Sequence, residues 1–255
     1  MINYKELATK EDIREMKEEL MLIRDLVWRC GGDTCSVFHP RDCQDLLQKG
    51  YRESKVYTIF PKKGSRFQVF CDQQTDGGGW TVIQRRQDGS ENFFRTWDDY
   101  KTGFGNLSNE FWLGNEKIHT ITESGNYTLR IDLKDFSGNT RYATWRYVPT
   151  YRKFSVGNEE SGFILNVSLY RGDAGNSMFI HNGMKFVTKD RDNEKKCAKQ
   201  TKGGWWYKAC LTANLNGLYL KGEHESLADG VNWGHWKGYR YSLMYADMKI
   251  RRTSV

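Results

Sequence analysis

Residues 2 to 30 place apolar side chains alternately three and four positions apart, which is the a/d pattern of a heptad repeat. The apolar residues are Ile13, Met16, Leu20, Ile23 and Val27. Asp12 and Glu19 fall at g positions, and the e positions that face them in a parallel pair of helices hold basic residues. The pattern predicts a coiled-coil helix over residues 1–30 that assembles a homo-oligomer. A single amphipathic helix lying on its own domain is the alternative, because the repeat is short.

Beyond Gly31 and Gly32 the helical period stops and strand-like patterns follow. One short helix is predicted over residues 42–47. Runs rich in aromatic and β-branched residues predict strands over 57–60, 67–71, 127–133 and 163–170, and a turn followed by a strand over 77–84. Helix signals between these strands are sparse and short. The globular region therefore begins near Asp33 and consists mainly of strands and loops.

The composition indicates that aromatic side chains supply much of the buried surface. Only 38% of the residues are hydrophobic, but 14% are aromatic, and the chain has 25 glycines and 3 prolines. These values are typical of a loop-rich fold. A length of 255 residues is sufficient for one large domain, so we expect one globular domain over residues 34–255 after the N-terminal helix.

The globular part is basic. The formal net charge is +7, and residues 1–30 contain six basic and seven acidic residues, so the remainder carries 7 − (−1) = +8. Such a charge can attract anionic glycans, membrane surfaces or nucleic acid. The basic residues are interspersed with acids and form no long run, which favours a solvated surface over nucleic-acid binding.

The six cysteines, at positions 30, 35, 43, 71, 197 and 210, form no CxxC motif and have no histidine at zinc-finger spacing. Their even number indicates disulfides and an oxidising compartment. Cys30 falls on the apolar seam of the predicted coil, where a link between two chains would be natural. Pairing of Cys30 with Cys35 is the competing interpretation.

Other features agree with secretion. Sequons for N-glycosylation begin at Asn106, Asn126 and Asn166. No apolar segment approaches the roughly 20 residues needed to span a bilayer, so no transmembrane segment is expected. Met1 is followed by a charged stretch and not by an apolar signal sequence. We expect a mature or trimmed part of a secreted, extracellular protein.

Catalytic motifs are missing from the sequence. It contains no HExxH and no GxSxG, and its five histidines show no helical ligand spacing. The glycines at 77–79 lack the spacing and the lysine of phosphate-binding loops. The chain is therefore not expected to be an enzyme.

The stretch Asp190–Gly217 combines spaced acids, a cysteine pair, two adjacent tryptophans and an Asn/Gly-rich turn. Asp190 and Asp192 alternate as acids do at the opening of a calcium loop, where a turn aims alternate oxygens at one ion. The stretch is not an EF-hand, because Lys195 stands where that loop needs glycine. A solvated acidic turn is the alternative on these residues alone. The tryptophans are expected to be buried anchors rather than sugar-stacking platforms.

Nine sequence blocks occur in one specific order. They are CD at 71–72, GGGWTVIQRR at 77–86, DGS at 88–90, GFG at 103–105, EFWLGN at 110–115, GDAG at 172–175, GGWWY at 203–207, NLNG at 214–217 and YSLMYADMKIR at 241–251. With these blocks the chain resembles the fibrinogen-related domain (fibrinogen C-terminal domain) family over about residues 34–252. ADGVNW at 228–233 and KGY at 237–239 are most similar to ficolin and tachylectin-type lectins, and angiopoietin-type ligands are less similar there.

The resemblance implies an α+β fold with a central, mostly antiparallel sheet and a long-looped C-terminal ligand subdomain. It implies disulfides between Cys43 and Cys71 and between Cys197 and Cys210, each contributing roughly 3–4 kcal/mol in the chain-entropy model.

The resemblance also implies a structural Ca2+ ion, held by Asp190, Asp192 and nearby backbone carbonyls. Here the run from Asp190 to Cys197 is shorter than the usual family spacing. Lys195 and Lys196 place two positive charges beside the expected ion, which oppose its binding unless they are directed outward.

In the lectin branch, the acetyl group of an N-acetylated sugar enters a small pocket lined by aromatic rings, a histidine and an alanine. The matching positions here are Thr201, Leu211, Leu227 and Ala228, of which only the alanine agrees. The substitutions leave an aliphatic pocket with one hydroxyl. Such a pocket accepts a methyl group but selects poorly among sugars.

The sequence therefore predicts a secreted fibrinogen-like lectin that recognises glycans or acetylated groups on cell or microbial surfaces in innate defence. Calcium would assist binding, and clustering through the coil would add avidity. The alternative is a protein-binding receptor ligand or matrix-associated factor whose altered pocket meets an apolar side chain of a receptor. The pocket substitutions favour this alternative, and the C-terminal blocks favour the lectin.

Overall fold

The computed structural model describes residues 38–146 and 154–253. The chain divides into two compact units, Met1–His39 and Pro40–Val255. The predicted coiled coil over residues 1–30, together with Cys30 and Cys35, lies outside the described residues and stays a prediction. All described helices and strands belong to the second unit.

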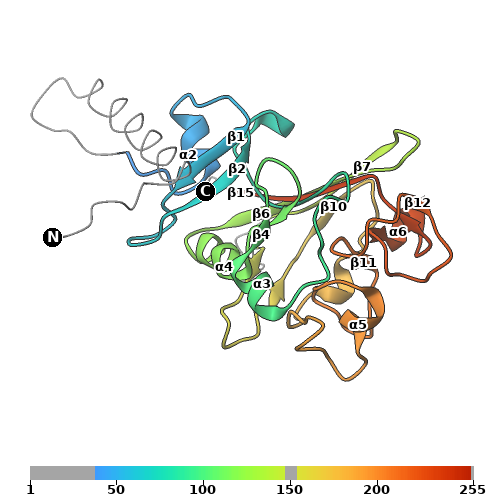
Figure 1. Cartoon of the computed structure of the whole chain (residues 1–255). Coiled ribbons are helices and arrows are strands. Elements are labelled where there is room, and N and C mark those ends of the chain that lie inside the picture. Colours follow the sequence, from blue (N-terminus) through green and yellow to red (C-terminus); the bar gives the residue numbers. More distant parts are fainter. Residues whose placement is uncertain (1–37, 147–153, 254–255) are drawn as a thin grey trace, which may run out of the picture. The chain divides into compact units, whose positions relative to one another are not determined.

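The second unit contains many strands and a few short helices (Figure 1). In chain order these are α2 (Cys43–Gln48), β1 (Lys55–Ile59), β2 (Phe67–Asp72), η1 (Thr75–Gly77), β3 (Trp80–Arg86), α3 (Trp97–Thr102), β4 (Phe104–Gly105), β5 (Phe111–Trp112), α4 (Asn115–Glu123), β6 (Tyr127–Lys134), β7 (Thr140–Trp145), β8 (Ser155–Val156), β9 (Leu165–Asn166), β10 (Tyr170–Gly172), η2 (Phe179–His181), α5 (Cys197–Thr201), β11 (Ala213–Asn214), β12 (Gly222–Glu223), β13 (Asn232–Trp233), α6 (Gly234–Lys237), β14 (Tyr241–Ser242) and β15 (Tyr245–Arg252).

Nine of the described strands form the main sheet, in the order β1-β2-β3-β15-β6-β7-β10, with β5 paired to β3 and β4 paired to β5. All of these pairings are antiparallel. The last strand, β15, lies between β3 and β6. Figure 1 shows β15 in red running beside the green β6, although the two are far apart in sequence. The predicted α+β fold with a mostly antiparallel sheet is confirmed for the described residues.

Strand β6 shows how the sheet separates a core face from a polar face. Its residues alternate between buried and half-buried positions, because successive side chains of a strand point to opposite faces. The buried set is Tyr127, Leu129, Ile131 and Leu133, and the half-buried set is Thr128, Arg130, Asp132 and Lys134. Burial of each aliphatic side chain contributes about 1.5–3 kcal/mol, so the register of β6 is strongly specified.

On the polar face, Lys249 of β15 is surrounded by three carboxylates. Its ammonium nitrogen lies 2.8 Å from Asp72, 2.9 Å from Asp132 and 2.9 Å from Asp247. Only 3% of the Lys249 side chain is exposed. Burial lowers the pKa of Lys249, but the three acids outweigh that effect and raise it above its ordinary value. The cluster joins β2, β6 and β15 by charge as well as by hydrogen bonds.

The first disulfide fixes the start of the second unit to the sheet. Cys43 and Cys71 are bonded, with Cα atoms 5.4 Å apart, and join α2 to β2. Asp42 caps α2 by accepting from the Asp45 amide at 3.0 Å, and it also accepts from the Tyr127 hydroxyl at 2.8 Å. These contacts connect α2 with β2 and β6, two strands that are not neighbours in the sheet.

Most of the strands expected from the sequence are present. The predicted helix at 42–47 and the strands at 57–60, 67–71 and 127–133 occur with ends shifted by at most two residues, and the turn and strand predicted over 77–84 correspond to a turn followed by β3.

The single strand predicted over residues 163–170 is wrong. In this region only Leu165–Asn166 (β9) and Tyr170–Gly172 (β10) are strands. Phe163 before β9 and Leu169 between β9 and β10 both have a φ of 50°, a left-handed conformation that interrupts a strand. The Phe163 carbonyl accepts a hydrogen bond from the buried Trp206 indole at 2.8 Å. Tertiary contacts therefore overrode the strand propensity of this segment.

Replacing Lys249 should leave three carboxylates close together without their common cation. We expect Lys249→Met to lower the free energy of unfolding by about 3–5 kcal/mol, measured by urea denaturation at pH 7. The double variant Lys249→Met/Asp247→Leu should recover part of this loss, because it removes the most deeply buried carboxylate together with the cation. A loss below about 1 kcal/mol in the single variant would contradict the central role of this cluster.

Candidate functional site

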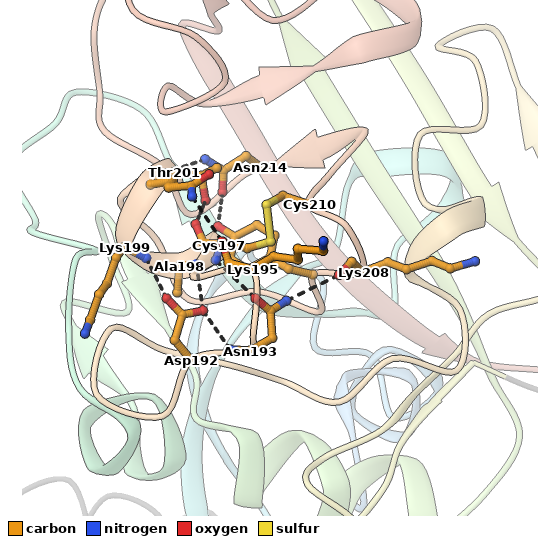
Figure 2. The surroundings of a disulfide bond; sticks show 12 residues. Asp192, Asn193, Lys195, Cys197, Ala198, Lys199, Thr201, Lys208, Cys210 and Asn214 are labelled. Atoms are coloured by element: carbon orange, nitrogen blue, oxygen red, sulfur yellow. Dashed lines mark hydrogen bonds between the residues drawn. A yellow bond between two sulfur atoms is a disulfide. The ribbon is translucent and has the colours of Figure 1, made fainter.

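The stretch Asp190–Gly217 folds around the second disulfide (Figure 2). Cys197 and Cys210 are bonded, with Cα atoms 5.3 Å apart, and the peptide bond before Cys210 is cis. Helix α5 begins at Cys197, and the residues on either side of it, Lys196 and Lys202, have φ values of 54° and 55°. The loop is thus closed covalently over one short helix.

The side chains of Asp192 and Asn193 organise this loop. The Asp192 carboxylate accepts from the Ala198 amide at 3.0 Å and from the Lys199 amide at 2.9 Å. Asn193 accepts from the first amide of α5 at 3.1 Å and donates to the Lys208 carbonyl at 3.3 Å; Figure 2 shows these contacts as dashed lines. Because the first N–H groups of a helix lack partners within it, the two side chains act as the N-terminal cap of α5.

Asp190 contacts a different helix. Its carboxylate accepts from the Trp97 amide at 2.9 Å and from the Thr188 hydroxyl at 2.8 Å. Trp97 is the first residue of α3, so the acid faces the positive end of that helix dipole. Arg191 lies over the Trp97 ring, 4.7 Å from its centroid. Asp190 and Asp192 therefore connect the N-termini of α3 and α5.

These contacts leave Asp190 and Asp192 little capacity for a calcium ion. A carboxylate offers about four lone-pair sites. Asp192 accepts from three amides, and Asp190 accepts from the Trp97 amide through both oxygens and from the Thr188 hydroxyl. Ca2+ takes about 6–8 oxygen ligands, yet no cluster of three or more acidic, histidine or cysteine side chains suited to a metal occurs within residues 38–146 and 154–253. The carbonyls of Asn193 and Lys196 accept hydrogen bonds inside the loop. The residues present fit calcium poorly, and the calcium site stays a prediction.

Asn214 brings together two of the predicted pocket residues. Its side-chain amide donates to the carbonyl oxygens of Thr201 at 2.8 Å and Ala228 at 3.1 Å. Its own oxygen accepts from the Tyr207 hydroxyl at 2.6 Å. Asn214 is completely buried, and hydrogen bonds shielded from water in this way hold their partners firmly. The chain segments that carry Thr201 and Ala228 are therefore held at a fixed separation.

The remaining pocket residues present apolar surface. Leu211 is half-buried, and Leu227 is 64% exposed. The Thr201 hydroxyl donates to the Cys197 carbonyl at 2.8 Å, so its proton is used within α5. These residues thus carry methyl and methylene groups and little unused hydrogen-bonding capacity, and the aliphatic pocket that they are expected to line stays a prediction.

The turn at residues 214–217 is anchored on the main sheet. Arg86 of β3 is 1% exposed and donates to two carbonyls of this turn, at 3.0 and 2.7 Å. Gln84 of the same strand donates to the turn at 3.0 Å, and Glu110 lies 3.7 Å from Arg86 as its counter-charge. The turn that carries Asn214 is therefore fixed to the central strand β3.

Both tryptophans of the stretch are core residues, as the sequence predicted. Trp205 and Trp206 are completely buried. The Trp206 ring packs against Trp112 and Phe186, with centroids 6.0 and 5.1 Å away. The rings fix the loop to the domain interior and are not available to a sugar.

Sequence patterns missed His181, which connects the loop to the segment before it. His181 Nδ1 lies 2.8 Å from the Trp206 carbonyl, and Nε2 accepts from the amides of Thr212 at 3.3 Å and Ala213 at 3.2 Å. This pattern places one proton on Nδ1, so the ring is neutral. Burial lowers the pKa of His181 to about 4. A single buried histidine has no characteristic spacing, and no motif could have found it.

The three sequons differ in their surroundings. Asn106 is exposed in the turn after β4, where its side-chain oxygen accepts from the Ser108 amide at 2.9 Å. Asn126 is half-buried. Asn166 lies in β9, and its amide donates to the Ser155 hydroxyl at 3.3 Å. Since a glycan needs a surface position, Asn106 is the best placed acceptor.

Comparison with known proteins agrees with the fold. Residues 39–253 match the family described as "Fibrinogen beta and gamma chains, C-terminal globular domain". Fibrinogen C domain-containing protein 1 of Xenopus tropicalis is 52% identical over 216 residues, which cover 83% of this chain and 47% of that protein. Techylectin-5A of Tachypleus tridentatus is 50% identical over 221 residues, with 83% and 74% covered. The fibrinogen-like globe domain of human ANGPTL2 has a TM-score of 0.80 at 43% identity, covering 84% of this chain and 100% of that domain.

The chain therefore belongs to the fibrinogen-related domain family, which confirms the resemblance seen in its sequence blocks. It spans about half the length of the first curated relatives that it matches. Among the helices described, none is long and apolar enough to cross a membrane.

Acidification should destabilise the domain through His181. Its folded-state pKa is depressed from 6.5 to about 4, so stability from the neutral ring is present above pH 6.5 and is lost as the pH falls toward 4. Between pH 7 and pH 5.5, the wild type should lose about 1 kcal/mol more unfolding free energy than His181→Gln. Urea denaturation at the two pH values measures this difference, and equal losses would refute it.

Expression in a eukaryotic secretory system should attach a glycan at Asn106. We expect Asn106→Gln to increase gel mobility by the step that removal of one N-glycan produces. Asn166→Gln, whose amide is engaged between β8 and β9, should leave the mobility unchanged. A glycan found at Asn166 and not at Asn106 would show that exposure in the folded domain does not govern this modification.

Proposed function

We propose that this domain is part of a secreted, extracellular recognition protein that binds glycans or acetylated groups on cell or microbial surfaces. The binding face is formed by Thr201, Leu211, Leu227 and Ala228. The domain acts by binding and not by catalysis. Its two disulfides support an oxidising, extracellular compartment.

The observation that carries this proposal is the buried Asn214 amide, which holds the carbonyls of Thr201 and Ala228. A pocket held in place before binding avoids much of the entropy loss of ordering a loop around the ligand. Its apolar walls suit the methyl of an acetyl group. The name of techylectin-5A describes that relative as a lectin, which agrees with a glycan ligand.

A protein ligand is the second candidate, and Leu227 favours it. A leucine that is 64% exposed gains free energy when a partner covers it. The match to the globe domain of ANGPTL2 covers 84% of this chain. The match to techylectin-5A covers 83%, so coverage of the chain is about equal for the two kinds of relative. In this candidate function, an apolar receptor side chain occupies the position of the acetyl methyl.

The proposal does not depend on calcium or on oligomerisation, but each would add to it. Calcium at Asp190 and Asp192 would stiffen a loop that hydrogen bonds already hold. Assembly through residues 1–30 would cluster weak sites and raise avidity on a repetitive surface. Light scattering under non-reducing conditions measures the oligomeric state.

The proposal is tested on a glycan array probed with the full chain, in calcium and in EDTA, together with titration of N-acetylglucosamine. Leu227→Ser should weaken binding to a positive glycan about tenfold, because an apolar contact is lost. Leu211→His/Leu227→Tyr should strengthen binding of N-acetylglucosamine, because it supplies the ring and imidazole of the sugar-binding relatives.

Leu169→Ser is the matched control, since Leu169 is also an exposed leucine, at 48%, and lies outside the pocket. It should leave glycan binding unchanged. A blank array with folded protein would exclude the glycan proposal and leave the protein ligand. Binding in calcium that is abolished by EDTA would support the calcium prediction.

A further inference from the structure

The polar face of the main sheet contains a cavity of about 570 Å3. Residues of three neighbouring strands, β6, β7 and β15, line it, together with Asp72 of β2 and Asp173 after β10. None of the four residues assigned to the pocket at Thr201 and Ala228 belongs to this lining. The cavity is therefore separate from that pocket and is formed mainly by strands.

The register of the sheet places the lining side chains on one face. Lys134 of β6 pairs with Tyr245 of β15 on one side and with Thr140 of β7 on the other. Tyr142 pairs with Asp132, two residues before Lys134 in β6. Directly opposed residues point to the same face of a sheet, as do residues two apart in one strand. These five side chains are therefore gathered at the cavity by backbone pairing.

The floor of the cavity is a cluster of paired charges. The Lys249 side chain is 3% exposed and lies 2.9 Å from Asp132, which also accepts from Arg130 at 2.9 Å. The Arg130 guanidinium lies over the Tyr142 ring, 4.9 Å from its centroid, and Tyr142 is 41% exposed. These contacts order the floor and one wall before a ligand binds, which lowers the entropy cost of binding.

Two basic side chains at the β6–β7 end of the cavity, Lys134 and Arg141, form no ion pair with any residue that the structure describes. They differ in direction. Arg141 pairs with Leu133 of the core face, and its guanidinium lies 5.7 Å from the centroid of the Trp236 ring. Lys134 belongs to the polar face. The cavity thus presents the Lys134 ammonium group as an available positive charge.

Hydrogen-bonding groups beside Lys134 are also available. The hydroxyls of Thr140 and Tyr142 make no hydrogen bond to another residue within 38–146 and 154–253. The exposed Asp173 carboxylate accepts from the Tyr142 amide at 2.8 Å through one oxygen, and its other oxygen has no partner among the same residues. A hydroxyl both donates and accepts, and a carboxylate oxygen accepts. These groups suit a ligand that carries several hydroxyls next to one anionic group.

The charges and the ring select the class of ligand. One ammonium group matches one negative charge, because further charges would lie close to the carboxylates of Asp132 and Asp173. This arrangement disfavours sulfated polysaccharides and nucleic acids, which carry charges at short intervals. The exposed Tyr142 ring suits the apolar C–H face of a sugar ring. A pyranose that carries a single carboxylate combines these features.

We propose that the cavity binds a carboxylated pyranose residue of a glycan, such as a uronic acid or a sialic acid. Lys134 binds the carboxylate, and the Tyr142 ring packs against the sugar. Asp173 and the Thr140 hydroxyl bind sugar hydroxyls. The site goes beyond the proposed function, because it needs neither an acetyl group nor the residues of the pocket.

Cellobiouronic acid, which carries one carboxylate, and its neutral counterpart cellobiose are the probes. Their binding to the full chain is measured by NMR titration in EDTA at about 0.15 M NaCl. The wild type should bind the acid about tenfold more tightly than cellobiose, because the Lys134 ammonium is close to the carboxylate. Lys134→Gln should bind the two probes equally, and Lys134→Arg should keep most of the preference. Sialyllactose compared with lactose distinguishes the two sources of the carboxylate.

The ring is tested by a second set of variants. Tyr142→Ser should weaken binding of cellobiouronic acid about tenfold, because the apolar contact is lost. Tyr142→Phe keeps the ring and should stay within about threefold of the wild type. The matched controls are Phe179→Ser, which removes a ring that is 58% exposed outside the cavity, and Lys63→Gln, which removes a charge outside it. Both should bind as the wild type does.

Several outcomes would overturn the proposal. They are failure of both acids to bind, an unchanged preference for the acid in Lys134→Gln, and equal losses in Lys134→Gln and Lys63→Gln. Equal or tighter binding of a blocked glutamyl dipeptide would assign the cavity to an acidic peptide. Tighter binding of a heparin disaccharide that is lost in Lys134→Gln would contradict the selection of a single charge.

The two proposals can fail separately. N-acetylglucosamine has no carboxylate, so its titration tests the pocket alone. Lys134→Gln should weaken binding of the acid and leave any binding of N-acetylglucosamine unchanged, since Lys134 does not belong to the pocket. A parallel loss of both ligands would show that one shared site binds them and would overturn the separate cavity site.

Discussion

Arg86 lies buried in β3 and directs its guanidinium at two carbonyls of the turn at residues 214–217. A buried cation must be satisfied by oxygen atoms, and truncating one partner of such a contact leaves an uncompensated charge. The turn is therefore held where its carbonyls accept from both Arg86 and Gln84. That position determines where Asn214 lies. Asn214 in turn holds the segments that carry Thr201 and Ala228 at a fixed separation.

The carboxylates of the loop at residues 190–208 can serve either to bind a cation or to cap helices. Asp190 and Asp192 each accept from the first amides of a different helix, and the calcium ion expected at the same two acids stays a prediction. Both arrangements neutralise negative charge and fix the loop.

The sequence was most informative where a property is local or where a whole block resembles a family. Alternation in β6, the cysteine pairs and the blocks from 71 to 251 led to the sheet, both disulfides and the family. Contacts between distant segments were not accessible. The strand predicted at 163–170 failed because an indole from residue 206 holds the Phe163 carbonyl. The role of Asp190 depends on an amide at residue 97, and His181 depends on three backbone groups that no spacing rule relates to it.

Strand β15 lies in the middle of the sheet and is the last element of the chain. During synthesis, β3 and β6 therefore emerge with facing edges that have no partner until residues 245–252 leave the ribosome. Unpaired strand edges are sites of aggregation, and folding that waits for distant segments is slow. The disulfide between Cys43 and Cys71 can form earlier, because both residues precede β3. A stop codon or proteolytic cut shortly before β15 would thus divide the sheet rather than shorten it and leave two half-sheets with exposed edges.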